Sequence, residues 1–186
     1  NAYYYRVGVI KGGSEVIGEE QKLNAFDFVL ASGSSDGTVK KIDSSGNEVW
    51  TFSGHTNGVY GVAVDSNGNV YSGSADNTVK KIDPDGNEIW TFTGHTDRVE
   101  GIAVDSNGYV YSGSNDSTLK KIDPDGNEVW AFSRDANKIR VVAVDSNEYV
   151  YYGGGNDRVT KIDSSGNEVW SFSGHTYTVY GISVDS

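Results

Sequence analysis

The chain has 186 residues, a length that suits one domain, and its formal net charge is −11 at pH 7. This acidic balance excludes nucleic acid and an anionic membrane as natural partners, because both require a basic protein surface. The chain contains no cysteine, which excludes disulfides and thiolate metal sites. No apolar run approaches the length of a transmembrane helix. We therefore expect a folded domain whose partner is neither nucleic acid nor a membrane.

Residues 1–25 do not share the pattern of the rest of the chain, and we expect them to form a separate N-terminal arm. The apolar stretch 3–10 is followed by Lys11-Gly12-Gly13 and then by residues 14–17, which favours a β-hairpin with a glycine-rich turn. Residues 3–5 are three adjacent tyrosines. They suggest a contact surface for the rest of the protein or a larger assembly, and an arm that packs against its own domain is the alternative.

Residues 26–186 repeat with a period of 40 residues. A unit of this length cannot bury its apolar surface alone, so it has to stack on a neighbouring unit. The period is carried by tryptophan at Trp50, Trp90, Trp130 and Trp170, and by aspartate at Asp43, Asp83, Asp123 and Asp163.

One unit contains four short apolar or alternating runs, at residues 59–64, 70–74, 78–82 and 88–92. The segments between them are rich in Asp, Asn, Gly and Pro, which preset turns or tolerate positive φ. No stretch has helical period. The sequence therefore predicts an all-β fold, a β-propeller of 40-residue four-stranded blades, with four blades' worth in the chain.

The repeat begins at a second strand near Phe28 and ends at a first strand, residues 179–184. We therefore expect the two ends to share one blade, within the chain or by strand exchange. Small residues on the innermost strands, such as Gly61 and Ala63, favour a shallow wedge between blades. For this reason we favour a homo-oligomer, two chains that exchange terminal strands in an eight-bladed ring. A closed four-bladed monomer and a fragment of a longer propeller are the alternatives.

The segments Gly54-His55-Thr56, 72–76 and Lys81-Ile82-Asp83 resemble the WD40 repeat in order and approximate spacing, and the resemblance covers residues 26–186. It implies a buried hydrogen-bonded network of a histidine, a serine and an aspartate in each blade. The tryptophan of that family network is replaced by isoleucine here, and a tryptophan stands on the fourth strand, as in quinoprotein-like propeller repeats. The expected trios are His55, Ser72 and Asp76; His95, Ser112 and Asp116; and, across the two chain ends, His175, Ser32 and Asp36.

The unit at residues 134–170 departs from the trio at all three positions, with Asp135, Tyr152 and Asn156. A buried network that loses one member leaves the others unsatisfied, at roughly 1–3 kcal/mol each. The joint loss therefore indicates that the three positions touch.

Residue chemistry indicates no catalytic, metal or cofactor site. The three histidines recur once per unit, each with its own serine and aspartate, which favours structural hydrogen bonding over metal binding. The acidic turns at residues 83–88 and 123–128 lack the spacing and terminal glutamate of a calcium loop. No nucleophile, base and orienting residue can be assembled from non-repeating positions. We therefore expect a protein that is not an enzyme.

Variation between units concentrates at one end of the blade, before and at the start of the innermost strands. Tyrosine and arginine, which are preferred contact residues, occur there, and loops on a rigid scaffold are where binding specificity usually lies. We expect a non-enzymatic scaffold that binds a protein or peptide. A repeat lectin that binds glycans between blades, and a structural component of a virion or cell surface, are the alternatives. The candidate contact residues are Tyr60, Arg98, Glu100, Arg140, Tyr177 and Tyr180.

Overall fold

The computed structural model describes residues 8–11, 14–17, 30–133, 137–155 and 157–185. Every regular element in these segments is a β-strand, so the predicted all-β class is confirmed. The described segments contain no helix long and apolar enough to span a bilayer.

The strands expected in the N-terminal arm pair with each other. β1 (Gly8–Lys11) and β2 (Ser14–Ile17) are antiparallel, with Lys11 opposite Ser14. They form a two-stranded sheet of their own. The turn residues 12–13 and the tyrosines at 3–5 lie outside the described residues. The division of the chain into an arm and a repeat region stays a prediction.

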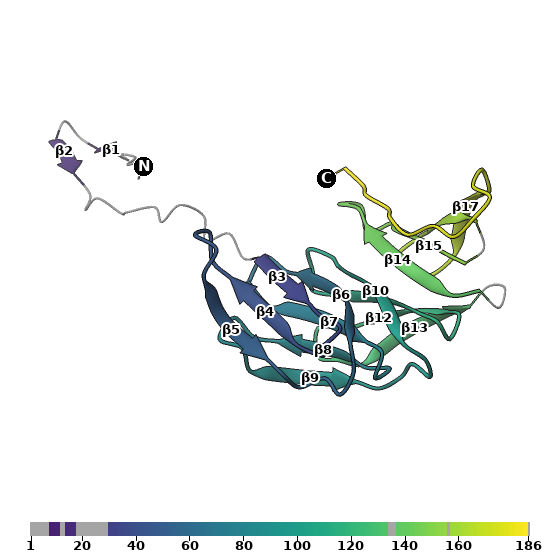
Figure 1. The fold of residues 1–186 in the computed structure, drawn as a ribbon. Coiled ribbons are helices and arrows are strands. Elements are labelled where there is room, and N and C mark those ends of the chain that lie inside the picture. The colour runs from purple at the N-terminus through teal and green to yellow at the C-terminus, as the bar shows by residue number, and fades with distance from the viewer. Residues whose placement is uncertain (1–7, 12–13, 18–29, 134–136, 156, 186) are drawn as a thin grey trace.

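The described residues between 30 and 172 form one three-stranded and three four-stranded antiparallel sheets, which are the propeller blades (Figure 1). The first blade contains β3 (Leu30–Gly33), β4 (Val39–Ile42) and β5 (Glu48–Phe52). The second contains β6 (Val59–Val64), β7 (Val70–Ser74), β8 (Val79–Ile82) and β9 (Glu88–Phe92). The third contains β10 (Val99–Val104), β11 (Val110–Ser114), β12 (Thr118–Ile122) and β13 (Glu128–Ser133). The fourth contains β14 (Ile139–Val144), β15 (Val150–Gly154), β16 (Val159–Ile162) and β17 (Glu168–Phe172).

Each blade is a meander because aspartate and glycine close its turns. Between β6 and β7, Asp65 Oδ1 accepts hydrogen bonds from the backbone N–H groups of Asn67 and Asn69, both at 2.9 Å. The Tyr71 hydroxyl donates to the other carboxylate oxygen at 3.0 Å. Gly68 has a φ of +80°, in the left-handed region that glycine enters without steric cost. The carboxylate thus fixes the turn and ties it to the next strand.

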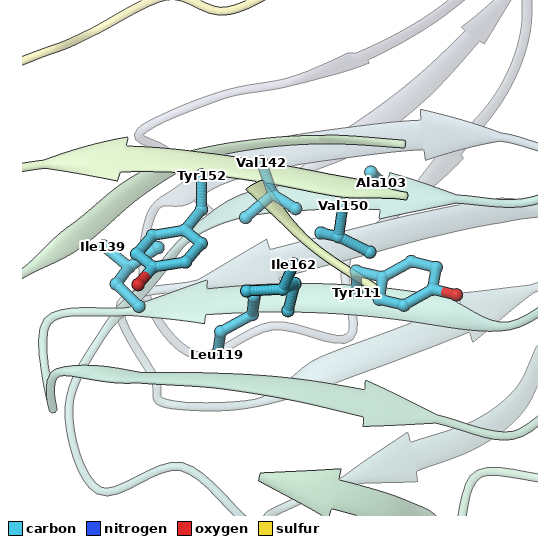
Figure 2. Packing of buried hydrophobic residues seen from close by; sticks show 8 residues of the cluster. All are labelled: Ala103, Tyr111, Leu119, Ile139, Val142, Val150, Tyr152 and Ile162. Atoms are coloured by element: carbon cyan, nitrogen blue, oxygen red, sulfur yellow. The ribbon is translucent and has the colours of Figure 1, made fainter. Parts of the chain in front are cut away.

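The hydrophobic core is divided into clusters that lie between consecutive blades. Between the first and second blades, Phe52 packs with Val59, Val70 and Ile82. Figure 2 shows the cluster between the third and fourth blades. Blades are therefore held together by apolar burial, and each needs a neighbour on both faces to bury its side chains fully.

Innermost strands follow one another along the row of blades, with β6 next to β10 and β10 next to β14. Their approach is close. A Cβ on Gly61 would lie 2.6 Å from the Glu100 carbonyl oxygen, so glycine is required there. The small residues expected on these strands thus permit backbone-to-backbone packing of neighbouring blades.

The two ends of the repeat do not meet within the chain. Figure 1 shows the blade of β3–β5 and the blade of β14–β17 at opposite ends of the row. Residues 179–184, predicted as a first strand, belong to no sheet in the structure. The first blade has three strands among the described residues, and β3 is at its edge. A strand needs a hydrogen-bonding neighbour, and the expected neighbour lies at the far end of the row. The four-bladed closure of a single chain is therefore not formed here.

Candidate functional site

The variable residues singled out from the sequence occupy equivalent positions on successive blades. Tyr60, Glu100 and Arg140 are the second residues of β6, β10 and β14. Tyr180 holds the same position in the segment after the fourth blade, and Arg98 directly precedes β10. Because innermost strands lie side by side, these side chains follow one another across the blades.

Five of the six residues form one connected row, which we call the Tyr–Arg row: Tyr60, Arg98, Glu100, Arg140 and Tyr180. Arg140 Nη1 donates to Glu100 Oε2 at 2.9 Å, and Arg98 Nη1 lies 3.9 Å from Glu100 Oε1. The Arg98 guanidinium lies 5.5 Å from the Tyr60 ring centroid, and that of Arg140 lies 5.6 Å from the Tyr180 ring centroid. The sixth residue, Tyr177, is 84% exposed and stands apart from the row.

The Tyr–Arg row is largely buried at its central residue, Glu100, and exposed to solvent at its ends. The Glu100 side chain is only 11% exposed, whereas that of Arg98 is 45% exposed. Arg140 Nε is buried and has no hydrogen-bond partner among the described residues. Two guanidinium groups share one carboxylate, so the row carries a local excess of positive charge on an acidic protein. Such a surface can pair with carboxylates and stack against planar or apolar groups.

The expected polar trios are present in the second and third blades. His55 Nε2 lies 2.8 Å from Ser72 Oγ, and His55 Nδ1 lies 2.9 Å from Asp76 Oδ2. His95 makes the same two contacts with Ser112 and Asp116, both at 2.8 Å. Each trio joins the segment before the first strand to the second strand and the following turn, so it fixes the inner corner of the blade.

Burial determines the charge state of the trio. Desolvation lowers the pKa of His55 below its ordinary value, despite the opposing effect of the hydrogen bond to Asp76. Burial alone raises the pKa of Asp76, but hydrogen bonds from Thr78, Thr56 and His55 bring it down to about 2. The arrangement is a neutral imidazole that donates from Nδ1 to a carboxylate and accepts from Ser72 at Nε2.

The third expected trio is not assembled within the chain. His175 is exposed and makes a ring contact with Phe172 at 5.9 Å. Ser32 and Asp36 are exposed on the first blade, at the other end of the row. In the fourth blade, Tyr152 replaces the serine and is buried with its ring 5.7 Å from Phe132. Asp135 and Asn156, the other two replacements, lie outside the described residues.

A second contact between blades was not anticipated from the sequence. Trp50 Nε1 donates to the Pro84 carbonyl oxygen at 2.9 Å, and Lys41 Nζ donates to the same oxygen at 3.0 Å. Trp90 and Trp130 dock in the same way on the turns of the third and fourth blades. We call this the Trp–turn contact. The residues of this contact can be recognised in the sequence, because the tryptophan, the lysine and the turn share the 40-residue period. Periodicity alone does not show which turn binds which side chain.

The acidic turns bind their own backbone. Asp83 Oδ1 accepts from the N–H groups of Asp85 at 2.9 Å and of Asn87 at 2.8 Å. Hydrogen bonds from Asn87 lower the pKa of the Asp83 carboxyl. No cluster of three or more metal-ligating side chains occurs in the described part of the chain. These aspartates stabilise the conformation of their own turns.

Stacked four-stranded meanders with His–Ser–Asp corners define a repeat β-propeller of WD40 type. The family model described as outer membrane protein assembly factor BamB matches residues 35–173, more than half of the chain, and the chain belongs to that propeller family. The crystal structure of the WD40 β-propeller domain of Doa1 is 25% identical, with a TM-score of 0.75. The match covers 82% of this chain and 52% of that one, so this chain spans about half of that structure. No curated protein matches the sequence.

Proposed function

We propose that this protein is a non-enzymatic scaffold that binds a protein or peptide through the Tyr–Arg row. Propellers of this kind generally mediate protein interactions, and the matching family is named for an assembly factor. The observation that carries the proposal is the row itself. It is a non-repeating set of arginines and tyrosines on an otherwise repeating scaffold.

The chemistry of the row points to a ligand that combines an acidic group with an aromatic or aliphatic side chain. Arg98 is half exposed and is held by Tyr60 and Glu100, so its guanidinium is oriented before a ligand arrives. Preorganised arginine and tyrosine side chains lose little conformational entropy on binding and are over-represented among binding hot spots. Tyr177, which is 84% exposed and not part of the row, is an additional candidate contact residue.

The glycan alternative has less support from the residues between blades. Tyr71 and Tyr111, which recur there, are fully buried, and their hydroxyl groups donate to Asp65 and Asp105. They do not line an open pocket. A structural role in a virion or cell surface would depend on the arm, most of which lies outside the described residues.

The scaffold is further proposed to be a homo-oligomer, in which two chains complete one ring of eight blades. The first and fourth blades each have a face or edge that no other blade covers, and the chain matches about half the length of a WD40 propeller domain. A scaffold of this kind would present two copies of the Tyr–Arg row around a common axis.

The binding proposal can be tested by selecting a displayed library of random peptides on the purified 186-residue chain. The selected peptides should combine an acidic with an aromatic or aliphatic residue. Arg98→Ala and Arg140→Ala should each weaken the Kd of such a peptide about tenfold or more, since hot-spot truncations cost more than about 1.4 kcal/mol. Asn67→Ala, an exposed change in the turn between β6 and β7, is the matched control and should leave the Kd unchanged.

Circular dichroism and thermal unfolding should confirm that both arginine variants remain folded. Selection of no peptide, or of peptides that bind equally well to the Arg98→Ala/Arg140→Ala double variant, would overturn the binding proposal.

A further inference from the structure

β3 is an open strand edge that lacks the protection of its counterparts. All residues of β7 and β11 are buried, whereas β3 is mostly exposed. Leu30 is 44% exposed, while the equivalent Val70 and Val110 are fully buried. Among the residues that the structure describes, no strand pairs with β3 on the side away from β4. Exposed edges of this kind bind a further strand readily.

Residues 179–184 are held in the position of a first strand without a sheet to join. The Val179 N–H donates to the Gly154 carbonyl at 3.0 Å, as the Val59 N–H donates to Ser34 at 2.9 Å. Val179 is buried against Gly153, as Val59 is against Gly33. The segment therefore stands beside the fourth blade as β6 stands beside the first.

The outer face of the fourth blade is also uncovered. Trp170 is 43% exposed, and Phe172 is 54% exposed whereas Phe52 and Phe92 are buried. Trp50, Trp90 and Trp130 each dock on the turn of the following blade. The turn at residues 43–46 has the same composition as the one that receives Trp130, yet nothing lies within 4 Å of a Cβ built on its Gly46.

We propose that the tail of one chain joins the head of a second copy of this chain to build a shared blade. The tail comprises Trp170, Phe172, His175 and residues 179–184. The head comprises β3 and the turn 43–46. Residues 179–184 add to the edge of β3, and Trp170 docks on the turn.

The tail supplies each contact that the head lacks: a strand for β3, a histidine for Ser32 and Asp36, and a tryptophan for the turn 43–46. Val62 lies opposite Ser72 in the second blade, which places Ile182 opposite Ser32 in the shared blade. That register brings His175 to Ser32 and Asp36, and so completes the third trio. Trp170 and Lys161 donate to the Ser44 carbonyl, as Trp130 Nε1 donates to that of Ser164 at 3.1 Å.

The shared blade also supplies the missing apolar cluster. Between the second and third blades, that cluster contains Tyr71, Phe92, Val99, Val110 and Ile122. Its equivalents at the joint would be Tyr151 of β15 with Phe172 and Val179 of the tail from one chain, and Leu30 of the head with Ile42 of β4 from the second. Burial of these apolar side chains favours association of the two chains. Two identical joints between them close a ring.

The partner of the head is the tail of a second copy, because a single chain places its own head and tail at opposite ends of its series of blades (Figure 1). The joint would also set Tyr180 of the second copy beside Tyr60, which continues the Tyr–Arg row around the ring. This inference deepens the proposed homo-oligomeric scaffold. It is separable from peptide binding, because one chain already holds the whole row.

The test is the mass of the 186-residue chain by light scattering over a range of concentrations. We expect twice the chain mass of 20.0 kDa. Leu30→Asp at the head and Trp170→Ala at the tail should each weaken dimer formation about 100-fold or more, as interface hot spots do. Val129→Asp is the matched control, because Val129 is similarly exposed but lies outside the joint, and it should remain dimeric.

Circular dichroism and thermal unfolding of the two joint variants distinguish loss of the joint from misfolding. Both variants should keep the β-sheet spectrum of the wild type while they are monomeric. A wild-type chain that stays monomeric, a dimer that survives both substitutions, or a mass that grows continuously with concentration would overturn the proposal. Peptide binding by monomeric Leu30→Asp would show that the binding proposal stands whatever the outcome at the joint.

Discussion

The His–Ser–Asp trio illustrates how a buried polar group stabilises a blade corner. The side chains of His55 and His95 are fully buried, and each ring nitrogen has a partner. Loss of one member leaves the others unsatisfied, at about 1–3 kcal/mol each. The fourth blade avoids this cost by placing an aromatic residue, Tyr152, where the serine would stand.

The lowered pKa values of His55 and His95 predict acid sensitivity. Both imidazoles bind protons more readily in the unfolded chain, so the free energy of unfolding should fall as the pH drops below the ordinary histidine value of 6.5. Asp76, with its pKa at about 2 against 3.8, should add a further loss between those two values. Urea denaturation at pH 8, 5.5 and 3 measures the effect.

The double variant His55→Asn/His95→Asn is the control for that experiment. Its stability should change less between pH 8 and 5.5 than that of the wild type. Stability that rises on acidification through this range would contradict a neutral histidine in the folded state.

At the scale of the strand and turn, the Trp–turn contact can be measured with a matched pair of glycines. Gly126 and Gly46 have φ values of +93° and +85°, so alanine at either position is strained by about 1–2 kcal/mol. A Cβ at Gly126 would also lie 3.0 Å from Trp90, whereas one at Gly46 meets nothing within 4 Å. In the Leu30→Asp background, Gly126→Ala should therefore destabilise more than Gly46→Ala, by about 1 kcal/mol. Chemical denaturation measures the difference, and equal losses would exclude a close tryptophan.

The strands themselves were predictable from local pattern. The four runs at residues 59–64, 70–74, 78–82 and 88–92 correspond to β6–β9, with a difference of one residue at the start of β8. Alternation and turn residues are local properties. Pairing is not local, so residues 179–184 carry the pattern of a first strand and remain unpaired in the single chain.

At the scale of the molecule, the blades form a one-dimensional array in which each contacts only its neighbours. Inner blades should resist opening more than end blades. We expect the amides of β7 and β11 to exchange most slowly with deuterium, and those of β3 and β17 most quickly, in monomeric Leu30→Asp. Mass spectrometry of peptic fragments can read this order. Uniform exchange across the four blades would show that the array opens as a single unit.

The candidate site was predictable as a face but not as a set of contacts. Comparison of repeats placed Tyr60, Glu100, Arg140 and Tyr180 on equivalent positions of neighbouring strands. The sequence could not show that one carboxylate holds two guanidinium groups, or that each guanidinium lies over a tyrosine ring, because these contacts depend on the spacing and rotation between blades. The function of the row stays a prediction.

The Trp–turn contact also bears on how such a chain can change in length. Trp50, Trp90 and Trp130 each donate to a turn 34 residues further along the chain, and the tryptophan and the turn recur in every unit. A duplicated 40-residue unit would therefore contain both a tryptophan that can donate to the turn of the next blade and a turn that can accept the tryptophan of the previous blade. Gain or loss of whole units in the gene alters the number of blades while leaving every junction chemically the same.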